Sequence, residues 1–205
     1  MPLNQDFWEN KYLQGHMPWD IGQAAPAFVK YFRDESKEQR TEKVAVLGCG
    51  RGHDTFFLRE NNNFNVYGFD YSKNAINYCK KINTKKNFKN IQFYQLDFFQ
   101  LLKDKKWKNY FDYVVEHTSF CAIDPKLRKN YFNLIHYLLK PSGKLVGLFF
   151  VRPRELGGPP YGTSVNEVRK LLKKDFKEIE KLHLVECLHK GKLEGDEYFG
   201  VLEKI

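Results

Sequence analysis

The chain is poor in cysteine and has no long apolar run. Its 205 residues include four cysteines, and the longest apolar stretch covers residues 145–151. A membrane-spanning helix needs roughly 20 apolar residues, so we expect no membrane partner. The cysteines are far apart, form no C-x-x-C pair and have no histidine at ligand spacing; they are Cys49, Cys79, Cys121 and Cys187. We interpret them as reduced thiols and expect no metal.

The N-terminus lacks the basic block and apolar core of a signal peptide. Asp6, Trp8 and Glu9 occur early instead, so we expect a cytoplasmic protein. The length suits one α/β domain over residues 1–205, and residues 1–40 are expected to form an N-terminal lid and helix.

The net charge of +9 raises the question of nucleic acid binding. The lysines, however, are dispersed over predicted helix faces and loops and are not interleaved with aromatic residues. This pattern favours a solvated basic surface, and we expect a small-molecule acceptor, not a nucleic acid, as the partner.

Short apolar runs alternate with helical segments, a pattern typical of a doubly wound sheet. We expect strands over 44–47, 65–69, 91–95, 111–116, 144–151, 181–188 and 197–203, with helices over 53–61, 73–81, 125–139 and 165–172. The last two strands are predicted to pair as a hairpin through residues 190–196. The fold class is therefore α/β, with a seven-stranded, mostly parallel sheet and one antiparallel edge strand. A monomer is the expected state.

A glycine-rich turn follows the first predicted strand. Gly48, Gly50 and Gly52 form G-x-G-x-G, and Asp70 ends the next strand. Glycine lets the backbone turn sharply and approach a ligand closely, while a carboxylate at a strand end suits a ribose diol. These features predict a cofactor that contains adenosine. The alternative is a tight turn with no ligand, and Asp70 argues against it.

One position separates two kinds of cofactor. A dinucleotide site has the pattern G-x-G-x-x-G, but His53 stands where its third glycine should be. The G-x-G-x-G form is instead associated with Rossmann-like methyltransferases that use S-adenosylmethionine (SAM). Val46 departs from many SAM enzymes, which place an acidic residue two positions before the first glycine.

The segment 6–26 interrupts the alternation of strands and helices. It holds Trp8, Tyr12 and Trp19 among polar residues. Open α/β sheets bind ligands at the carboxyl ends of their strands, so we expect this segment to act as a lid there.

Five motifs occur in order along the chain: Trp8-Glu9-x-x-Tyr12-x-x-Gly15-x-x-Pro18-Trp19-Asp20-x-Gly22, 47–54, Asp97-Phe98-Phe99, 116–123 and Gly157-Gly158-Pro159-Pro160-Tyr161. Together they resemble the thiopurine S-methyltransferase (TPMT) superfamily, with the thiol, thiocyanate and halide methyltransferases as the most similar branch. The resemblance covers residues 5–165, and this branch often lacks the acidic residue that Val46 replaces.

The resemblance implies a Rossmann-like class I fold and SAM as the cofactor, released as S-adenosyl-L-homocysteine. It implies that the two tryptophans close over SAM and that the glycines pass under its methionine portion. It also implies that Asp70 binds the ribose and that Asp97 and Phe98 bracket the adenine. Glu116 and His117 would lie beside the sulfonium and the substrate. The cofactor-binding residues are thus Trp8, Trp19, Gly48, Gly50, Asp70, Asp97, Phe98, Glu116 and His117. For the phenylalanines, core packing is an equal alternative.

The implied reaction is methyl transfer to a small soft nucleophile by in-line displacement. Such a nucleophile needs no obligatory general base, so no residue is assigned as catalytic with certainty. We expect a largely apolar pocket formed by His117, Phe120 and Tyr161, in which the imidazole or the phenol donates a hydrogen bond to the entering anion. Arg152 and Arg154 follow the fifth predicted strand and could favour an anionic acceptor.

Two other functions remain open at this point. Pro159-Pro160-Tyr161 and the basic charge suggest a nucleic-acid N-methyltransferase, but Gly158 replaces the Asp or Asn that such enzymes have before this triplet. The other is a SAM-binding protein without catalysis.

Overall fold

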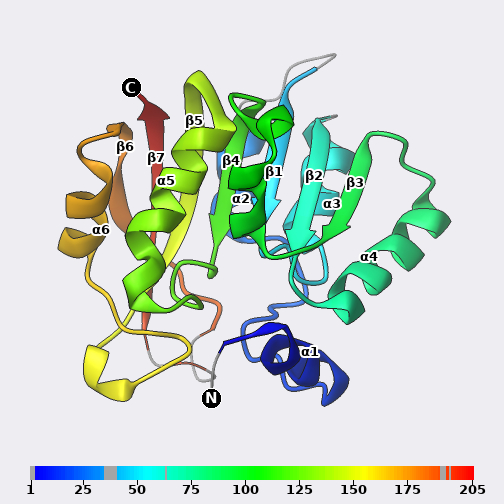
Figure 1. Cartoon of the computed structure of the whole chain (residues 1–205), viewed down its shortest axis with the longest axis horizontal. Helices are drawn as coiled ribbons and strands as arrows, with labels where there is room; N and C mark the ends of the chain where they lie inside the picture. Colours follow the sequence, from blue (N-terminus) through cyan, green and yellow to red (C-terminus); the bar gives the residue numbers. More distant parts are fainter. Residues whose placement is uncertain (1–2, 35–40, 63, 190–192, 194) are drawn as a thin grey trace. The chain divides into compact units, whose positions relative to one another are not determined.

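The computed structural model describes residues 3–34, 41–62, 64–189, 193 and 195–205. Two compact units, Met1–Gln100 and Leu101–Ile205, divide the chain, and each is described by itself (Figure 1).

The first unit contains three parallel strands: β1 (Lys43–Leu47), β2 (Asn65–Asp70) and β3 (Ile91–Gln95), in the order β3-β2-β1. Val66 pairs with Val44 on one side and with Ile91 on the other. β1 and β2 are buried along nearly their whole length, as expected for parallel strands that are covered on both faces.

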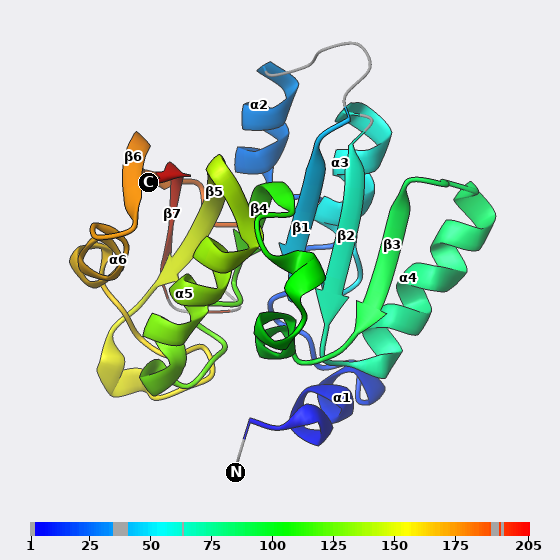
Figure 2. The same cartoon turned by 45° about the horizontal axis from the view of Figure 1, so that its top comes forward.

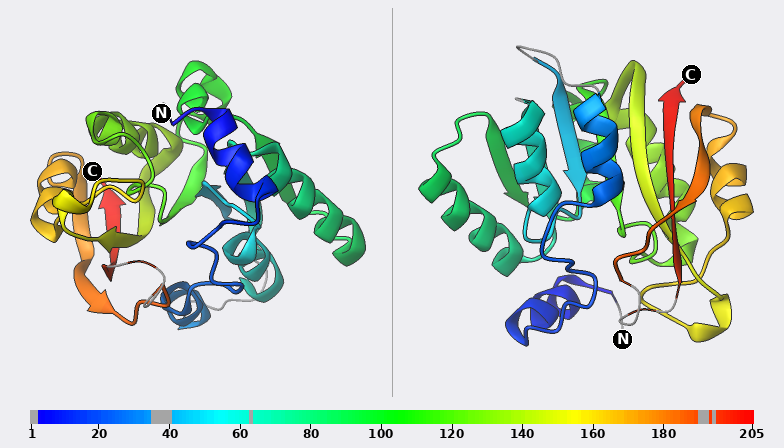
Figure 3. Two further views of the ribbon diagram at one scale, coloured as in Figure 1. Left: turned by 90° about the horizontal axis from the view of Figure 1, so that it is seen from below. Right: turned by 180° about the vertical axis from the view of Figure 1, so that it is seen from behind.

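Four helices accompany these strands: α1 (Gln5–Leu13), α2 (Pro26–Asp34), α3 (His53–Asn62) and α4 (Lys73–Lys86). α4 lies on one face and α2 and α3 on the other, while α1 lies beyond the carboxyl ends of the strands (Figures 2 and 3). Ser72 caps α4, as predicted, by accepting a hydrogen bond from the Ala75 N–H at 3.1 Å. The helix continues past the predicted residue 81 because no helix breaker occurs before Asn87, whose left-handed φ of 54° ends it.

The second unit contains the other four strands: β4 (Phe111–His117), β5 (Leu139–Val151), β6 (Phe176–Val185) and β7 (Asp196–Lys204). Their order is β4-β5-β7-β6. β4 and β5 are parallel, and β7 is antiparallel to both β5 and β6. The single antiparallel strand that the sequence predicted is therefore β7, next to the edge strand β6.

The helices of this unit are α5 (Arg128–Leu138) and α6 (Val165–Leu172), which pack on the same face of its strands (Figure 3). Short 3₁₀ turns complete it: η1 (Phe98–Lys103), which begins in the first unit, η2 (Lys105–Trp107), η3 (Pro125–Leu127) and η4 (Arg154–Leu156). None of the helices in the described ranges is long and apolar enough to cross a membrane.

Two strands, β5 and β6, have bounds that differ from the prediction. β5 begins at Leu139, directly after α5, and pairs there with Phe111 before a register shift. β6 begins at Phe176 and ends at Val185. The charged residues at its start are typical of a loop when only the sequence is considered, but they are also typical of an edge strand. Most of the predicted hairpin turn, residues 190–192 and 194, lies outside the described residues.

Candidate active site

The glycine turn joins β1 to α3 in a conformation that requires glycine. Gly48, Gly50 and Gly52 have φ angles of 64°, 53° and 78°, a region that L side chains rarely adopt. Space is also limited, because a Cβ at Gly52 would lie 2.9 Å from the Cys79 Sγ. The three glycines therefore present backbone without side chains at the carboxyl ends of the strands.

Asp70 ends β2 and is hydrogen-bonded to this turn. Its Oδ2 accepts the Gly50 N–H at 2.8 Å, and its Oδ1 accepts the Ser72 N–H at 2.8 Å. Burial raises the pKa of Asp70 to about 6, although these hydrogen bonds favour the charged form. Each carboxylate oxygen keeps a further lone pair, so the group can accept hydrogen bonds from two ribose hydroxyls.

Aromatic rings from the N-terminal segment gather around Trp19. The Trp8 and Trp19 rings meet edge to face with centroids 5.5 Å apart, and the Tyr12 ring lies 6.0 Å from Trp19. Tyr12 also lies over the glycine turn, since its hydroxyl would be 3.1 Å from a Cβ at Gly50. Burial, and then the negative charge of Asp70, raise the pKa of Tyr12.

Two carboxylates fix the N-terminal segment in place. Glu9 of α1 accepts hydrogen bonds from the Ser72 hydroxyl at 2.6 Å and from the Asn74 side-chain amide at 2.6 Å. Asp20 contacts the His53 Nε2 at 3.0 Å at the start of α3. The sequence motifs include Glu9, Tyr12 and Asp20 but did not predict these contacts. In the structure these three residues hold the N-terminal segment beside the residues predicted to bind the cofactor.

Asp97 and Phe98 follow β3. The Asp97 Oδ1 accepts the Phe99 N–H at 2.9 Å, and this contact starts η1. The Phe98 ring is tilted against Phe99, with centroids 5.0 Å apart. The first unit thus places the glycine turn, Asp70 and the Asp97-Phe98 pair at the carboxyl ends of β1, β2 and β3, respectively.

Glu116 lies near the end of β4 in the second unit and is fully buried. Its Oε1 accepts the Phe120 N–H at 2.8 Å, and its Oε2 accepts the Tyr131 hydroxyl at 3.1 Å. Burial raises the pKa of Glu116 to about 7. Both oxygens hold neighbouring protein groups, so the carboxylate shapes the loop that follows β4.

Phe120, predicted as a pocket residue, lies in an aromatic core. It is 0% exposed, its ring stacks on Phe132 at 5.2 Å and meets Phe149 edge to face at 5.8 Å. The Arg128 guanidinium lies 4.7 Å from the ring centroid. These contacts are those of a packing residue, and its role toward a substrate stays a prediction.

Arg128 also holds the loop that carries Tyr161. The guanidinium is almost fully buried and donates to the carbonyls of Tyr161 and Gly162 at 3.1 Å each and to Glu167 of α6 at 3.1 Å. The Tyr161 N–H donates to the Cys121 carbonyl at 2.6 Å, and its ring packs on Gly158. The loop is thereby fixed to the segment that follows β4.

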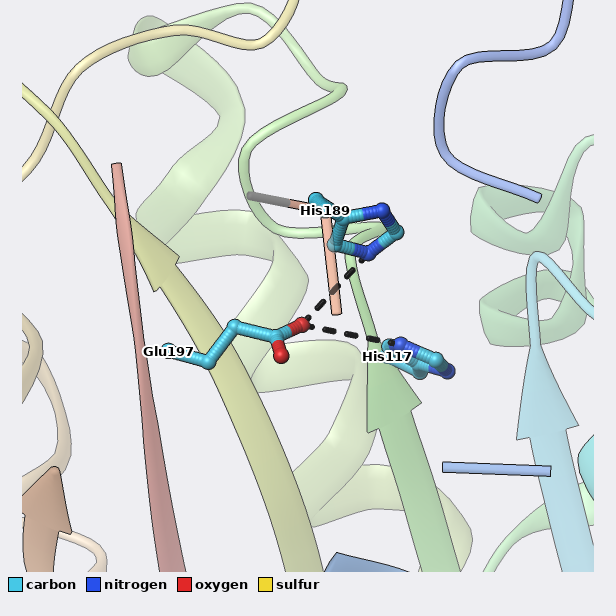
Figure 4. A group of neighbouring side chains, drawn as sticks. All are labelled: His117, His189 and Glu197. Carbon is cyan, nitrogen blue, oxygen red and sulfur yellow. Dashed lines mark ion pairs between the residues drawn. The ribbon is translucent and has the colours of Figure 1, made fainter. Parts of the chain in front are cut away.

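His117, His189 and Glu197 converge on one point in the second unit (Figure 4). His117 ends β4, Glu197 is near the start of β7, and His189 lies in the connection between β6 and β7. The Glu197 Oε1 is 3.8 Å from the His117 Nε2 and 3.5 Å from the His189 Nε2. Sequence reasoning missed His189 and Glu197, because no local motif marks either of them.

A cavity of about 430 Å³ lies between the end of β5 and the start of β7. Its lining residues are Val151, Arg152, Pro153, Thr163, Gly195 and Asp196. Arg152 donates to the Pro160 carbonyl at 3.4 Å, so the cavity contains a cation beside the loop of Tyr161.

Solved structures share this fold. Burkholderia thailandensis 1,6-didemethyltoxoflavin-N1-methyltransferase, solved with 1,6-didemethyltoxoflavin and S-adenosylhomocysteine, is similar with a TM-score of 0.76 at 19% identity, over 98% of this chain and 86% of that one. The fold is that of the class I SAM-dependent methyltransferases, as the sequence predicted.

The model of the thiopurine S-methyltransferase (TPMT) family matches residues 3–200, and the chain belongs to this family. "Probable thiol methyltransferase 2" of Arabidopsis thaliana is 34% identical over 166 residues, which cover 80% of this chain and 70% of that protein. Thiopurine S-methyltransferase of Vibrio cholerae is 27% identical over 177 residues, 81% and 79% of the two chains. The predictions of a SAM-dependent methyltransferase and of SAM as the cofactor are thus confirmed.

Proposed function

We propose that this enzyme transfers the methyl group of SAM to a small soft nucleophile: a thiol, sulfide, thiocyanate or halide. The observation that carries the proposal is the 34% identity, over 80% of this chain, to the probable thiol methyltransferase of Arabidopsis thaliana. The cavity lined by Arg152 and Asp196 supports it, because it has room for a small acceptor.

The cofactor residues have distinct proposed roles in the first unit. The Asp70 carboxylate accepts hydrogen bonds from the ribose hydroxyls, and Asp97 and Phe98 bind the adenine. The bare backbone of the glycine turn passes beneath the methionine portion. Trp8 and Trp19 attract the sulfonium, since a cation over an aromatic face gains ~0.5–2 kcal/mol.

The N-terminal segment is proposed to act as a lid over the cofactor residues of this unit. Glu9 anchors α1 to the start of α4, and Asp20 anchors the following turn to the start of α3. The two contacts hold Trp8 and Trp19 together above the carboxyl ends of the strands. Closure would exclude water from a reaction in which water competes as a nucleophile.

The reaction is proposed to be a direct in-line displacement. The soft atom of the acceptor forms a bond to the methyl carbon while the bond from that carbon to the sulfonium breaks, and S-adenosyl-L-homocysteine leaves as a neutral thioether. The acceptor is already nucleophilic as an anion, so alignment supplies most of the acceleration, an effect that reaches ~7–11 kcal/mol in favourable cases.

The acceptor residues belong to the second unit. Tyr161 is held by Arg128 and carries a phenol that can donate a hydrogen bond to an anion. His117 ends β4 and offers an imidazole for the same task. Arg152 supplies positive charge at the cavity. These three side chains are the proposed determinants of preference for a small anion.

A headspace gas-chromatography screen tests the proposal. Purified enzyme and SAM are incubated with iodide, thiocyanate, sulfide, methanethiol or an aromatic thiol, and methylated products are measured. We expect turnover of at least one sulfur or halide acceptor. At a SAM concentration below saturation, turnover should be strongly reduced in Asp70→Asn and retained in Glu180→Gln, an exposed change on β6. If SAM binds but no acceptor in the panel is methylated, the proposed function is wrong.

A further inference from the structure

Two histidines and a glutamate from three separate segments meet inside the second unit (Figure 4). Their exposure is low: the side chains of His117, His189 and Glu197 are 13%, 0% and 4% exposed. Ionisable groups are seldom buried together unless they pair with one another or coordinate a metal. The cluster therefore needs an explanation beyond chance proximity.

The spacing of the three ligand atoms fits a shared cation better than direct hydrogen bonds. A hydrogen bond from an imidazolium to a carboxylate is about 2.7–2.9 Å long, but the Glu197 Oε1 lies 3.8 and 3.5 Å from the two Nε2 atoms. Zinc bonds of about 2.0–2.2 Å in tetrahedral geometry place neighbouring ligand atoms about 3.3–3.5 Å apart. The ligand atoms of the cluster all lie within 4.8 Å of one another.

The donor set is also that of a known kind of metal site. Two imidazoles and one carboxylate bind Zn²⁺ in catalytic sites that keep a fourth position open. Such a site carries a net charge of about +1 from one dication and one carboxylate, so it favours an anionic fourth ligand. Among anions, a thiolate is favoured as the fourth ligand, because Zn²⁺ binds the soft sulfur atom well.

The surroundings of the cluster orient one of its histidines and place the cluster next to the cavity. Phe150 meets the His189 ring edge to face at 6.0 Å and holds it in position. Glu197 directly follows Asp196, which lines the cavity beside Arg152.

We propose that His117, His189 and Glu197 form a Zn²⁺ site with three protein ligands, whose open position binds a thiolate or hydrosulfide. The second half of this statement rests on the proposed function, whereas the metal site itself does not. The zinc ion would hold the acceptor sulfur as its anion at neutral pH, because a coordinated thiol is deprotonated. His117 would then be a zinc ligand in place of a hydrogen-bond donor to the anion, and the expected absence of a metal would be wrong.

The direct test is zinc binding by the full-length protein after treatment with a chelator. Dialysis against Zn²⁺ followed by elemental analysis should give one bound ion per chain, and calorimetry should give its affinity. Glu197→Gln keeps the size of the side chain and should weaken binding at least tenfold, as should His189→Ala. Circular dichroism and thermal melting establish that each variant is folded.

A second histidine and glutamate pair provides the matched control. His183 and Glu180 on β6 lie 3.7 Å apart but are both exposed, at 49% and 44%. His183→Ala and Glu180→Gln should leave the zinc affinity unchanged. If wild type binds no zinc, or if these variants lose as much affinity as Glu197→Gln, the site is overturned.

Cobalt substitution tests the open position without SAM or turnover. Co²⁺ at a four-coordinate site gives intense visible bands, and hydrosulfide or a small thiol should add a sulfur-to-cobalt charge-transfer band that is absent in Glu197→Gln. Cobalt bands with no response to any thiol would overturn the acceptor half and leave the metal site intact. Zinc binding without methylation of any acceptor in the screen would count against the proposed function alone.

Discussion

The Asp70 carboxylate accepts the backbone N–H of Gly50 at 2.8 Å, from a residue 20 positions earlier in the chain. This hydrogen bond joins the glycine turn after β1 to the end of β2. The Ser72 N–H donates to the other oxygen of Asp70 at 2.8 Å, so two backbone donors fix the orientation of the carboxylate. The group is therefore pre-positioned before any ligand arrives.

Asp70→Asn should weaken SAM binding by about ten- to a hundredfold, since hydrogen bonds to a charged group contribute about 1.5–3 kcal/mol. The amide also turns an N–H donor toward either Gly50 or Ser72. Calorimetry with SAM measures the effect. Asp104→Asn, at an exposed 3₁₀ cap in the second unit, is the control and should bind SAM as wild type does.

The raised pKa of Asp70 predicts a pH-dependent affinity for SAM. Its pKa is about 6 in the folded protein, against an ordinary 3.8, so the buried group is protonated first as the pH falls. We propose that SAM binds the ionised carboxylate, so the dissociation constant should rise as the pH drops below about 6. Calorimetry at pH 6 in buffers of different ionisation enthalpy should show proton release on binding, as observed heats that differ between the buffers. Equal observed heats in all buffers would contradict this.

The same pKa has a consequence for stability without ligand. A carboxyl group with a raised folded-state pKa favours folding when protonated, and this contribution is lost as the pH rises from 3.8 to about 6. Saturating SAM should offset the loss above pH 6. Thermal melting with and without SAM at pH 5 and 7 should show a larger stabilisation by SAM at pH 7.

Glu9→Gln should loosen the N-terminal segment, because the charged acceptor of the Ser72 and Asn74 hydrogen bonds is lost. For a partly exposed group we expect a loss of about 1 kcal/mol, seen as faster proteolysis of the first 20 residues and a several-fold weaker affinity for SAM. Asp6→Asn, in the first turn of the same helix, serves as the control. Equal cleavage rates in the two variants would remove Glu9 as the anchor.

Phe120→Ala should lower the free energy of unfolding by about 3–5 kcal/mol, the usual cost of removing a buried phenylalanine. The ring is fully buried against Phe132 and Phe149. Urea denaturation provides the measurement. Ile179→Ala, at a side chain that is 49% exposed, should cost less than about 0.5 kcal/mol. A similarly small cost at Phe120 would show that the ring does not stabilise the core and would favour its role at the pocket.

Tyr161→Phe should lower the rate of methyl transfer to iodide and hydrosulfide by about tenfold, if the phenol contributes a net hydrogen bond of about 1–1.5 kcal/mol to the anion. The backbone contacts of Tyr161 with Cys121 and Arg128 are kept in this variant, so the fold should not change. Unchanged rates for both acceptors would remove the hydroxyl from the mechanism.

The sequence was sufficient for features that depend on neighbours in the chain. The glycine turn, the Ser72 cap and the alternation of strands and helices follow from local geometry, and the family follows from ordered motifs. The starts of β6 and β5 were less predictable, because charged edge residues and a strand that begins directly after a helix have no local signature. The position of Asp70 at the end of a strand could be predicted, because this strand follows the glycine turn closely in the chain.

The cluster of His117, His189 and Glu197 could not be predicted in this way. The two histidines are 72 positions apart, 117 to 189, and only the antiparallel pairing of β7 with β5 brings Glu197 to the same end of the unit as the end of β4. The motif at 116–123 marked His117 as a pocket residue, but nothing in the local pattern of His189 distinguishes it from a surface residue. The cluster therefore depends on long-range strand pairing, which the spacing of residues in the sequence does not indicate.

The Glu9 anchor has a consequence for synthesis on the ribosome. α1 has no buried residue, and a helix of this length is marginal in water by itself. Its partner Ser72 is 63 positions later, so the helix leaves the ribosome well before the groups that hold it. The contact between Glu9 and Ser72 can therefore form only after residue 72 has been made.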